Sequence, residues 1–140
     1  MKIKVAATQM SCDWEIDNNI KKSIHLIEKA AEQGANIVLL QELFQTPYFC
    51  IQYDEEIFKL AQPFENNTLI KKMSEVAKKY KVVLPISFFE KDNNAYFNSI
   101  AVIDSDGKVL GKYRKSHIPD GAGYLEKYYF NPGDTGFKVW

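Results

Sequence analysis

The sequence predicts one α/β domain with a largely parallel β-sheet, and three observations lead to that fold class. Short apolar runs alternate with helix-like segments in the order β-α-β-α-β-β. The length of 140 residues is that of one ordinary domain. The composition, with 46% hydrophobic and 26% charged residues, is typical of a globular protein. Alternating strands and helices favour parallel strand pairing through right-handed crossovers.

Two strands and a helix between them are predicted first. Residues 3–9 form a short β-like run of small residues. A helix is predicted over 16–33, and Gly34 ends it. Apolar residues recur there at spacings of four and three, which defines one helical face made of Ile16, Ile20, Ile24, Ile27 and Ala31. Residues 36–40 are a continuous apolar run, as expected for a strand buried on both faces.

A second helix and a further strand come next. Residues 67–80 again place their apolar residues on one face, which predicts a helix. A strand follows at 82–90, and its Pro85 predicts a sheet edge or a bulge, because proline has no amide donor.

The last part of the sequence predicts a hairpin and a long loop. Strand-like residues 96–104 and 108–115 flank the turn sequence SDG, which predicts a β-hairpin. Residues 116–136 contain two prolines and four glycines and predict a loop. Residues 137–140, FKVW, predict the start of one more strand.

Charge and hydropathy exclude several classes of protein. Lys+Arg and Asp+Glu are both 18, whereas proteins that bind a nucleic-acid duplex usually carry a basic excess. No apolar run approaches the roughly 20 residues that span a bilayer. The first ten residues lack the apolar core of a signal peptide. With only Cys12 and Cys50 there is no disulfide framework, and we expect a cytoplasmic protein without membrane or nucleic-acid partners.

A carboxylate follows the second predicted strand, inside an otherwise apolar stretch. Residues 37–40 are apolar, Gln41 and Glu42 come next, and apolar residues resume at Leu43. In open α/β sheets, functional groups gather beyond the carboxyl ends of the strands. Burying a charge costs folding free energy unless the charge is paired with an opposite one, so an unpaired buried charge suggests a catalytic role. Glu42 is therefore either a solvent-facing or helix-capping charge, or a partly desolvated general base.

Basic residues gather in GKYRKSHIP, residues 111–119, at the end of the predicted hairpin. In an extended strand Lys112 and Arg114 share one face, while Tyr113 and Lys115 share the other. One interpretation is a solvated edge strand, where lysine prevents edge-to-edge aggregation. The other is that one cation points into a site and faces Glu42.

Three motifs resemble the carbon–nitrogen hydrolase (nitrilase) superfamily: ATQM near the start, NIVLLQELFQTPYF and GKYRKSHIPD. The stretch SHIPDGAGYLEKYYFNPGDTGFKVW resembles, more narrowly, the N-carbamoylputrescine amidase branch. The resemblance covers essentially all 140 residues. It implies the amino-terminal part of an α-β-β-α sandwich, in which helices cover two sheets from outside. Residues 1–140 are thus expected to be a partial carbon–nitrogen hydrolase domain.

Members of that superfamily use a glutamate, a lysine and a cysteine. The resemblance places the glutamate at Glu42, the lysine at Lys115 and a second, loop-borne carboxylate at Glu126. The nucleophilic cysteine would follow the strand predicted at 137–140, so the chain is expected to end before it. The residues expected to bind the substrate are Tyr48, His117, Asp120 and Tyr124.

The activity that the resemblance implies is hydrolysis of a non-peptide C–N bond, such as that of N-carbamoylputrescine. Glu42 would deprotonate the thiol, and Lys115 would stabilise the oxyanion. Glu126 would hold the ammonium or position the substrate. No cofactor is implied, and His25 and His117 lack the spacing of zinc ligands. The expected partner is a small carbamoyl amine or amide, and the parent enzyme is expected to be a homo-oligomer.

Two alternatives stay open. In the first alternative Cys50 is the nucleophile, with His117 as its base and Asp120 as the group that orients His117. Its context, YFCIQY, shows no electropositive setting, and a buried cysteine more often behaves as a small apolar residue. In the second alternative the chain is a catalytically inactive fragment, or a regulatory or assembly domain of the same fold, because an acid and an amine cannot complete turnover without the thiol.

Overall fold

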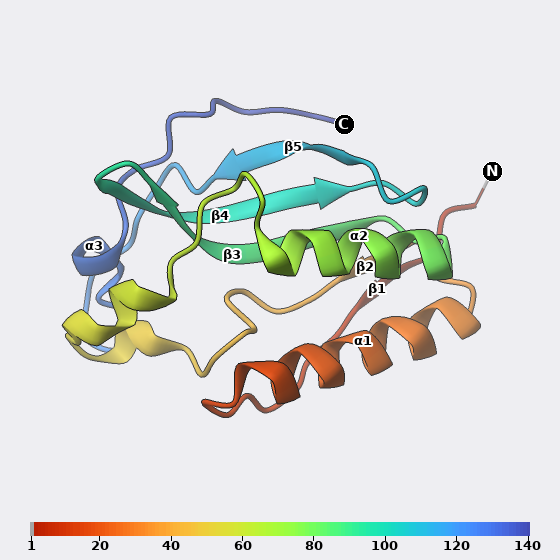
Figure 1. Cartoon of the computed structure of the whole chain (residues 1–140), viewed down its shortest axis with the longest axis horizontal. Coiled ribbons are helices and arrows are strands. Elements are labelled where there is room, and N and C mark those ends of the chain that lie inside the picture. The colour runs from red at the N-terminus through yellow and green to blue at the C-terminus, as the bar shows by residue number, and fades with distance from the viewer. Residues whose placement is uncertain (1) are drawn as a thin grey trace.

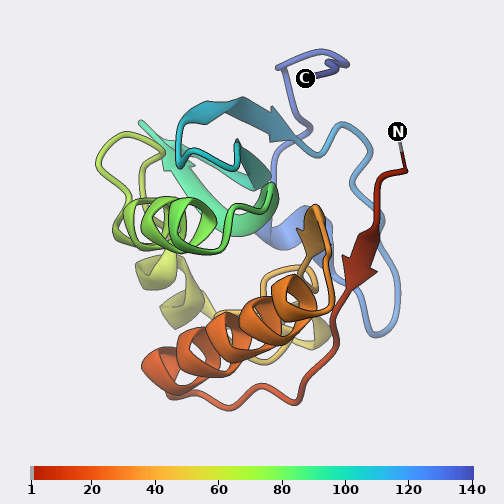
Figure 2. The same ribbon diagram turned by 90° about the vertical axis from the view of Figure 1, so that its right-hand side faces the viewer.

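Two helices pack on one face of a two-stranded and a three-stranded β-sheet in the computed structural model, which describes residues 2–140 (Figure 1). The helices are α1 (Ile16–Glu32) and α2 (Thr68–Tyr80), and Figure 2 shows them next to each other on the same side of the strands. The strands are β1 (Val5–Ala7), β2 (Ile37–Leu39), β3 (Leu84–Asp92), β4 (Ala95–Ile103) and β5 (Val109–Arg114). The predicted α/β fold class is confirmed.

One sheet is parallel and the other is antiparallel, so the prediction of largely parallel pairing is wrong. β1 and β2 are parallel, and a single parallel bridge between Ile37 and Val83 links β2 to the beginning of β3. β3, β4 and β5 are antiparallel neighbours in that order. The tight turn between β3 and β4 explains the difference. Asn93 adopts a φ of 52°, which asparagine tolerates, and so short a turn can join only antiparallel strands.

The helix ends follow from their local sequences. The side chain of Asn67 accepts a hydrogen bond from the Ile70 amide at 3.1 Å and caps the start of α2. Gly34 follows α1 with a φ of 83°, a conformation that glycine adopts without steric cost. The observed helices therefore match the predicted ranges 16–33 and 67–80 to within one residue at each end.

Two segments differ from the predicted pattern. Residues 137–140 form no strand, because they pair with no neighbouring strand; they lie over β5 through side chains, with Phe137 stacked on Tyr113 and Trp140 close to Gly111. The predicted loop 116–136 contains the short helix α3 (Glu126–Tyr129). Two 3-10 helices, η1 (Phe49–Ile51) and η2 (Glu55–Leu60), connect β2 to α2.

The apolar core lies between the two helices and the sheet. Its members include Ile27, Val38, Met73 and Ile86, all fully buried. The opposite face of β1 and β2 is open, where Val5 and Leu39 are 69% and 46% exposed. Within residues 2–140, none of the helices combines the length and the apolar character needed to cross a membrane.

Candidate active site

Glu42, Lys115 and Glu126 meet beyond the ends of two strands. Glu42 comes three residues after β2, Lys115 directly follows β5, and Glu126 begins α3. The Lys115 ammonium lies 3.3 Å from Glu42 Oε1 and 2.8 Å from Glu126 Oε2. The structure therefore brings together two carboxylates and the cation between them, in the arrangement that the sequence predicts.

The backbone around Glu42 is held on both sides. The Gln41 side chain makes two hydrogen bonds to the backbone of Met10: it accepts one from the Met10 amide at 2.9 Å and donates one to the Met10 carbonyl at 3.1 Å. These bonds connect the segments that follow β1 and β2. Leu43 has a φ of 51°, rare for a bulky residue. Its amide donates to Ser87 Oγ at 2.9 Å. The position of Glu42 is thus set by an unusual local conformation that hydrogen bonds maintain.

Asn98 of β4 contacts both catalytic candidates, and the sequence analysis missed it. Its side-chain amide donates to Glu42 Oε1, and its backbone carbonyl accepts from the Lys115 amide at 2.8 Å. Asn98 is only 4% exposed. A buried amide in the middle of the apolar run YFNSIAV was the available signal, because a buried polar side chain needs a partner.

Glu126 is the buried carboxylate of the site. It is 3% exposed, and both of its oxygens are engaged, since the Tyr48 hydroxyl donates to Oε1 at 2.7 Å and Lys115 binds Oε2. Burial, followed by the hydrogen bond to this carboxylate, raises the pKa of Tyr48 above its ordinary value. Tyr48 therefore stays a neutral donor and helps to hold Glu126 in place.

Lys115 stays positively charged in this setting. Burial acts to lower the pKa of its ammonium, but the hydrogen bond to Glu126 and the charge of Glu42 outweigh it and raise that pKa above its ordinary value. An ammonium has three N–H donors. The two carboxylates take two of them, which leaves one for a developing oxyanion.

Glu42 differs from the partly desolvated carboxylate that its apolar neighbours predict. Its side chain is 46% exposed, compared with 4% for Glu126, so the apolar residues around it pack elsewhere. Its Oε1 accepts hydrogen bonds from both Lys115 and Asn98, whereas its Oε2 accepts no hydrogen bond within residues 2–140. That free oxygen is the one that can take a proton from a nucleophile or from water.

A cavity of about 260 Å³ opens at this site. It combines Glu42, Asn98 and Lys115 with apolar walls from Leu39 and Ile100. Pockets of this kind, apolar with a few convergent polar groups, typically hold small molecules.

Three residues expected to bind the substrate lie apart from this cluster. His117, Asp120 and Tyr124 are exposed, and in the part of the chain described here no hydrogen bond or ion pair joins them to Glu42, Lys115 or Glu126. Their substrate contacts stay predictions. The same part of the chain has no group of three His, Cys, Asp or Glu side chains placed to bind a metal ion.

The other cations of the basic stretch point to the opposite face, as strand alternation predicts. Arg114 and Lys112 both bind Glu90, which is fully buried. Lys112 and Arg114 therefore stabilise the sheet, and Lys115 alone of these three faces Glu42.

Cys50 lies close to the site but is poorly suited to act as its nucleophile. It is fully buried, and no hydrogen bond joins it to His117 or Asp120 among residues 2–140. Burial, followed by the charge of Glu126, raises the pKa of its thiol to about 12. The thiolate is therefore scarce at neutral pH, which argues against the alternative of Cys50, His117 and Asp120 as a triad.

We expect Cys50 in the folded chain to react with iodoacetamide about 100-fold more slowly at pH 8 than it does in urea. Because its pKa is raised, its reactivity should increase as the pH rises toward 12. Mass spectrometry of the alkylated peptide at several times gives the rate. A rate equal to that of the unfolded chain would revive Cys50 as a nucleophile.

The fold and the site together define an α/β domain with a carboxylate–lysine–carboxylate centre. A protein-family model described as carbon-nitrogen hydrolase matches residues 4–140. The chain therefore belongs to the carbon–nitrogen hydrolase family, as its motifs predict.

Similar proteins include two curated relatives and one solved structure. An N-carbamoylputrescine amidase from Solanum lycopersicum is 53% identical over 99% of this chain and 46% of its own length. A citrullinase from Francisella tularensis is 49% identical over 99% of this chain and 48% of its own. The crystal structure of a carbon–nitrogen hydrolase from Helicobacter pylori G27 superposes with a TM-score of 0.88 at 38% identity, over 96% of this chain and 46% of that one. This chain thus spans about half the length of the curated relatives it matches.

Proposed function

We propose that this chain is part of an enzyme that hydrolyses N-carbamoylputrescine to putrescine, carbon dioxide and ammonia. The observation that carries the proposal is the Lys115 ammonium held between Glu42 and Glu126. It occurs in a chain that is 52–53% identical to plant N-carbamoylputrescine amidases. The finer assignment of the substrate rests on that similarity.

The proposed reaction proceeds through a thioester on a cysteine supplied by sequence beyond residue 140. Glu42 Oε2 takes the thiol proton while the sulfur attacks the carbamoyl carbon, and Lys115 stabilises the resulting oxyanion. The proton then passes to the leaving nitrogen and ammonia departs. Water, deprotonated by Glu42, next cleaves the thioester and restores the thiol. The carbamic acid that is released breaks down to putrescine and carbon dioxide.

Each residue at the site has a distinct part in this proposal. Glu126, with both oxygens engaged, fixes Lys115 rather than moving protons. Asn98 orients Glu42 through its Oε1 and leaves Oε2 for proton transfer. Tyr124 and Asp120 would meet the alkylammonium end of the substrate, through an aromatic face and a carboxylate. A cytoplasmic homo-oligomer stays a prediction.

Ammonia release tests the proposal directly. The full-length protein should convert N-carbamoylputrescine to ammonia and putrescine in equal amounts, whereas the 140-residue chain should release no more ammonia than a buffer blank. Citrulline serves as the matched competitor, because it carries the same ureido group on an amino acid. A higher kcat/KM for citrulline would overturn the substrate assignment, and ammonia release by the 140-residue chain would revive Cys50 as the nucleophile.

The alternative of an inactive fragment or an assembly domain predicts a different result. In that case the full-length protein would also release no ammonia from any carbamoyl amine or short amide. The precise placement of Lys115 and Asn98 around Glu42 favours the enzyme, because neither contact is needed to bury apolar surface.

A further inference from the structure

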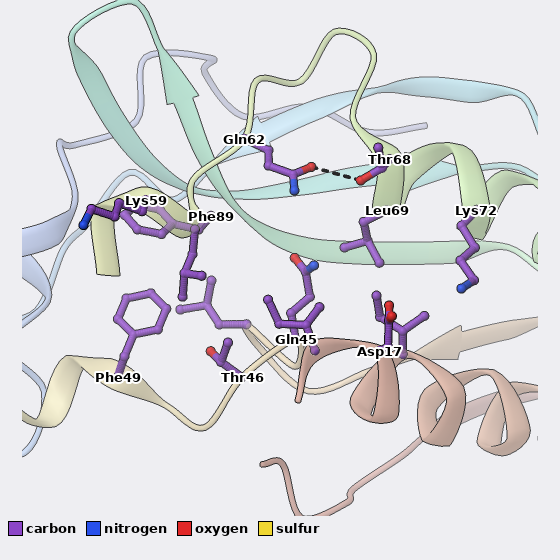
Figure 3. Close-up of a pocket in the computed structure, with 14 residues that line it drawn as sticks. Asp17, Gln45, Thr46, Phe49, Lys59, Gln62, Thr68, Leu69, Lys72 and Phe89 are labelled. Carbon is purple, nitrogen blue, oxygen red and sulfur yellow. Dashed lines mark hydrogen bonds between the residues drawn. The ribbon is translucent and has the colours of Figure 1, made fainter. Parts of the chain in front are cut away.

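A second cavity, of about 310 Å³, lies on the helix side of Leu43 and shares no lining residue with the cavity at Glu42. It lies between the beginning of α1, the beginning of α2 and the segment that contains η1 and η2, and it is open to solvent (Figure 3). Its apolar walls include Leu69, Phe49 and Phe89. The volume falls at the lower end of the range of small-molecule pockets, about 300–1,000 Å³.

Two polar side chains in this cavity lack partners. Thr46 is only 5% exposed, yet its hydroxyl makes no hydrogen bond within residues 2–140. The Gln45 side chain likewise has no hydrogen-bond partner there, and Figure 3 shows it extending into the cavity toward Leu69. Among the described residues no fully buried side-chain nitrogen or oxygen atom lacks a partner, so the Thr46 hydroxyl keeps access to the cavity and is free to bond to a polar group of a ligand there.

The mouth of the cavity carries two opposite charges that do not pair with each other. Asp17 projects from the first turn of α1 and Lys72 from α2, and Figure 3 shows both at the same end of the cavity. Neither takes part in an ion pair within residues 2–140. Lys59 also lines the cavity, but it is held by Glu56. An unpaired carboxylate and an unpaired ammonium at one end of an apolar cavity complement a zwitterion.

We propose that this cavity is a second ligand site, which binds a small aromatic amino acid with a hydrogen-bonding group at its far end. The ammonium of the ligand meets Asp17, and its carboxylate meets Lys72. Its ring lies along the apolar wall toward Phe49, and its terminal hydroxyl pairs with Thr46. This site is separate from the substrate site in chemistry as well as in position, because no lysine–carboxylate pair lies within it.

Occupation of the cavity would also act on Glu42. Leu43 forms part of the cavity wall, adjoins Glu42 and keeps its φ of 51° through the bond to Ser87 Oγ. A ligand packed against Leu43 stabilises that conformation and with it the position of Glu42. This consequence rests on the proposed function, whereas ligand binding itself does not.

Isothermal titration calorimetry of the full-length protein tests the site with four probes that differ by one group each. L-Tyrosine carries every proposed contact, L-phenylalanine lacks the hydroxyl, tyramine lacks the carboxylate, and 3-(4-hydroxyphenyl)propionate lacks the ammonium. We expect L-tyrosine to bind, and each of the others to bind about fivefold more weakly or worse. Absence of L-tyrosine binding up to its solubility limit overturns the proposal.

Variants assign the contacts. Thr46→Val should remove the preference for L-tyrosine over L-phenylalanine, and Asp17→Asn should remove the preference for L-tyrosine over 3-(4-hydroxyphenyl)propionate. Lys21→Gln, an exposed position on α1 outside the cavity, is the matched control and should bind all four probes as before. Preferences that survive both substitutions overturn the proposal. Binding without any change in ammonia release would retain the site and refute its action on Glu42.

Discussion

Replacing Glu42 by Gln in the full-length protein is expected to lower kcat for N-carbamoylputrescine by a factor on the order of 10³–10⁴ while the fold is kept. Glutamine has the same shape, and its amide oxygen can still accept the bonds from Lys115 and Asn98 that Glu42 Oε1 accepts now. Its NH₂ group, however, replaces the free Oε2 and cannot take a proton. The loss should therefore be chemical rather than structural.

Two measurements separate these effects. Ammonia release gives kcat, and thermal unfolding followed by circular dichroism should show a melting temperature close to that of the unaltered protein. The matched control is Glu55→Gln, at an exposed glutamate of η2 that makes no side-chain hydrogen bond in the part of the chain described here. If Glu42→Gln kept more than a tenth of the activity, Glu42 would not be the general base.

The predictions about Glu42 and Lys115 depend on features that the sequence contains. Glu42 follows a buried strand, and the alternation of side chains along 111–115 separates Lys115 from Arg114 by one position. Their meeting, 73 residues apart in sequence, followed from the family resemblance rather than from the spacing.

Other features depend on which strands are neighbours, which the sequence pattern does not determine. Asn98 reaches Glu42 only because β4 lies between β3 and β5. The backbone carbonyl of Asn98 accepts the hydrogen bond from the Lys115 amide only in this strand register. Asn93 and its turn could have indicated the antiparallel pairing, because asparagine favours the positive φ of tight hairpins. The exposure of Glu42 agrees with the solvent-facing alternative, because apolar neighbours in sequence do not have to be neighbours in space.

Arg114 illustrates the same limit for the basic stretch. The sequence is compatible with a solvated edge strand, and β5 does lie at the edge of its sheet. Arg114 is nevertheless only 5% exposed, because Glu90 of β3 lies two strands away on the same face. A pattern read along one strand cannot reveal a partner on another.

Replacing Arg114 by Leu is expected to lower the free energy of unfolding by about 3–5 kcal/mol, because it leaves the buried Glu90 without its main partner. The guanidinium binds Glu90 with two bonds, of 3.0 Å from Nε and 2.7 Å from Nη2, and also reaches Asp92 at 2.6 Å. It lies 3.8 Å from the centre of the Phe97 ring as well. Lys112 and Ser99 alone would remain to solvate the Glu90 carboxylate.

The pH dependence of stability should change in the same variant. Burial acts to raise the pKa of Glu90, but hydrogen bonds from Arg114, Lys112 and Ser99 outweigh it and hold that pKa below its ordinary value of 4.5. A carboxylate with a lowered pKa contributes stability that is fully present above its unfolded pKa and is lost as the pH falls through the folded pKa. Without Arg114 the folded pKa rises, so acid unfolding should begin at a higher pH.

Urea unfolding of the full-length protein measures the loss, and a double variant tests its cause. Glu90→Leu combined with Arg114→Leu removes both charges and should recover most of the stability, because apolar residues can replace a buried ion pair at little cost. Lys112, Asp92 and Asp134 also lose a partner, but their side chains are 20%, 46% and 66% exposed, so they can turn to solvent. A double variant as unstable as Arg114→Leu would show that the guanidinium stabilises the sheet through Phe97, Asp92 and Asp134 rather than by pairing with Glu90.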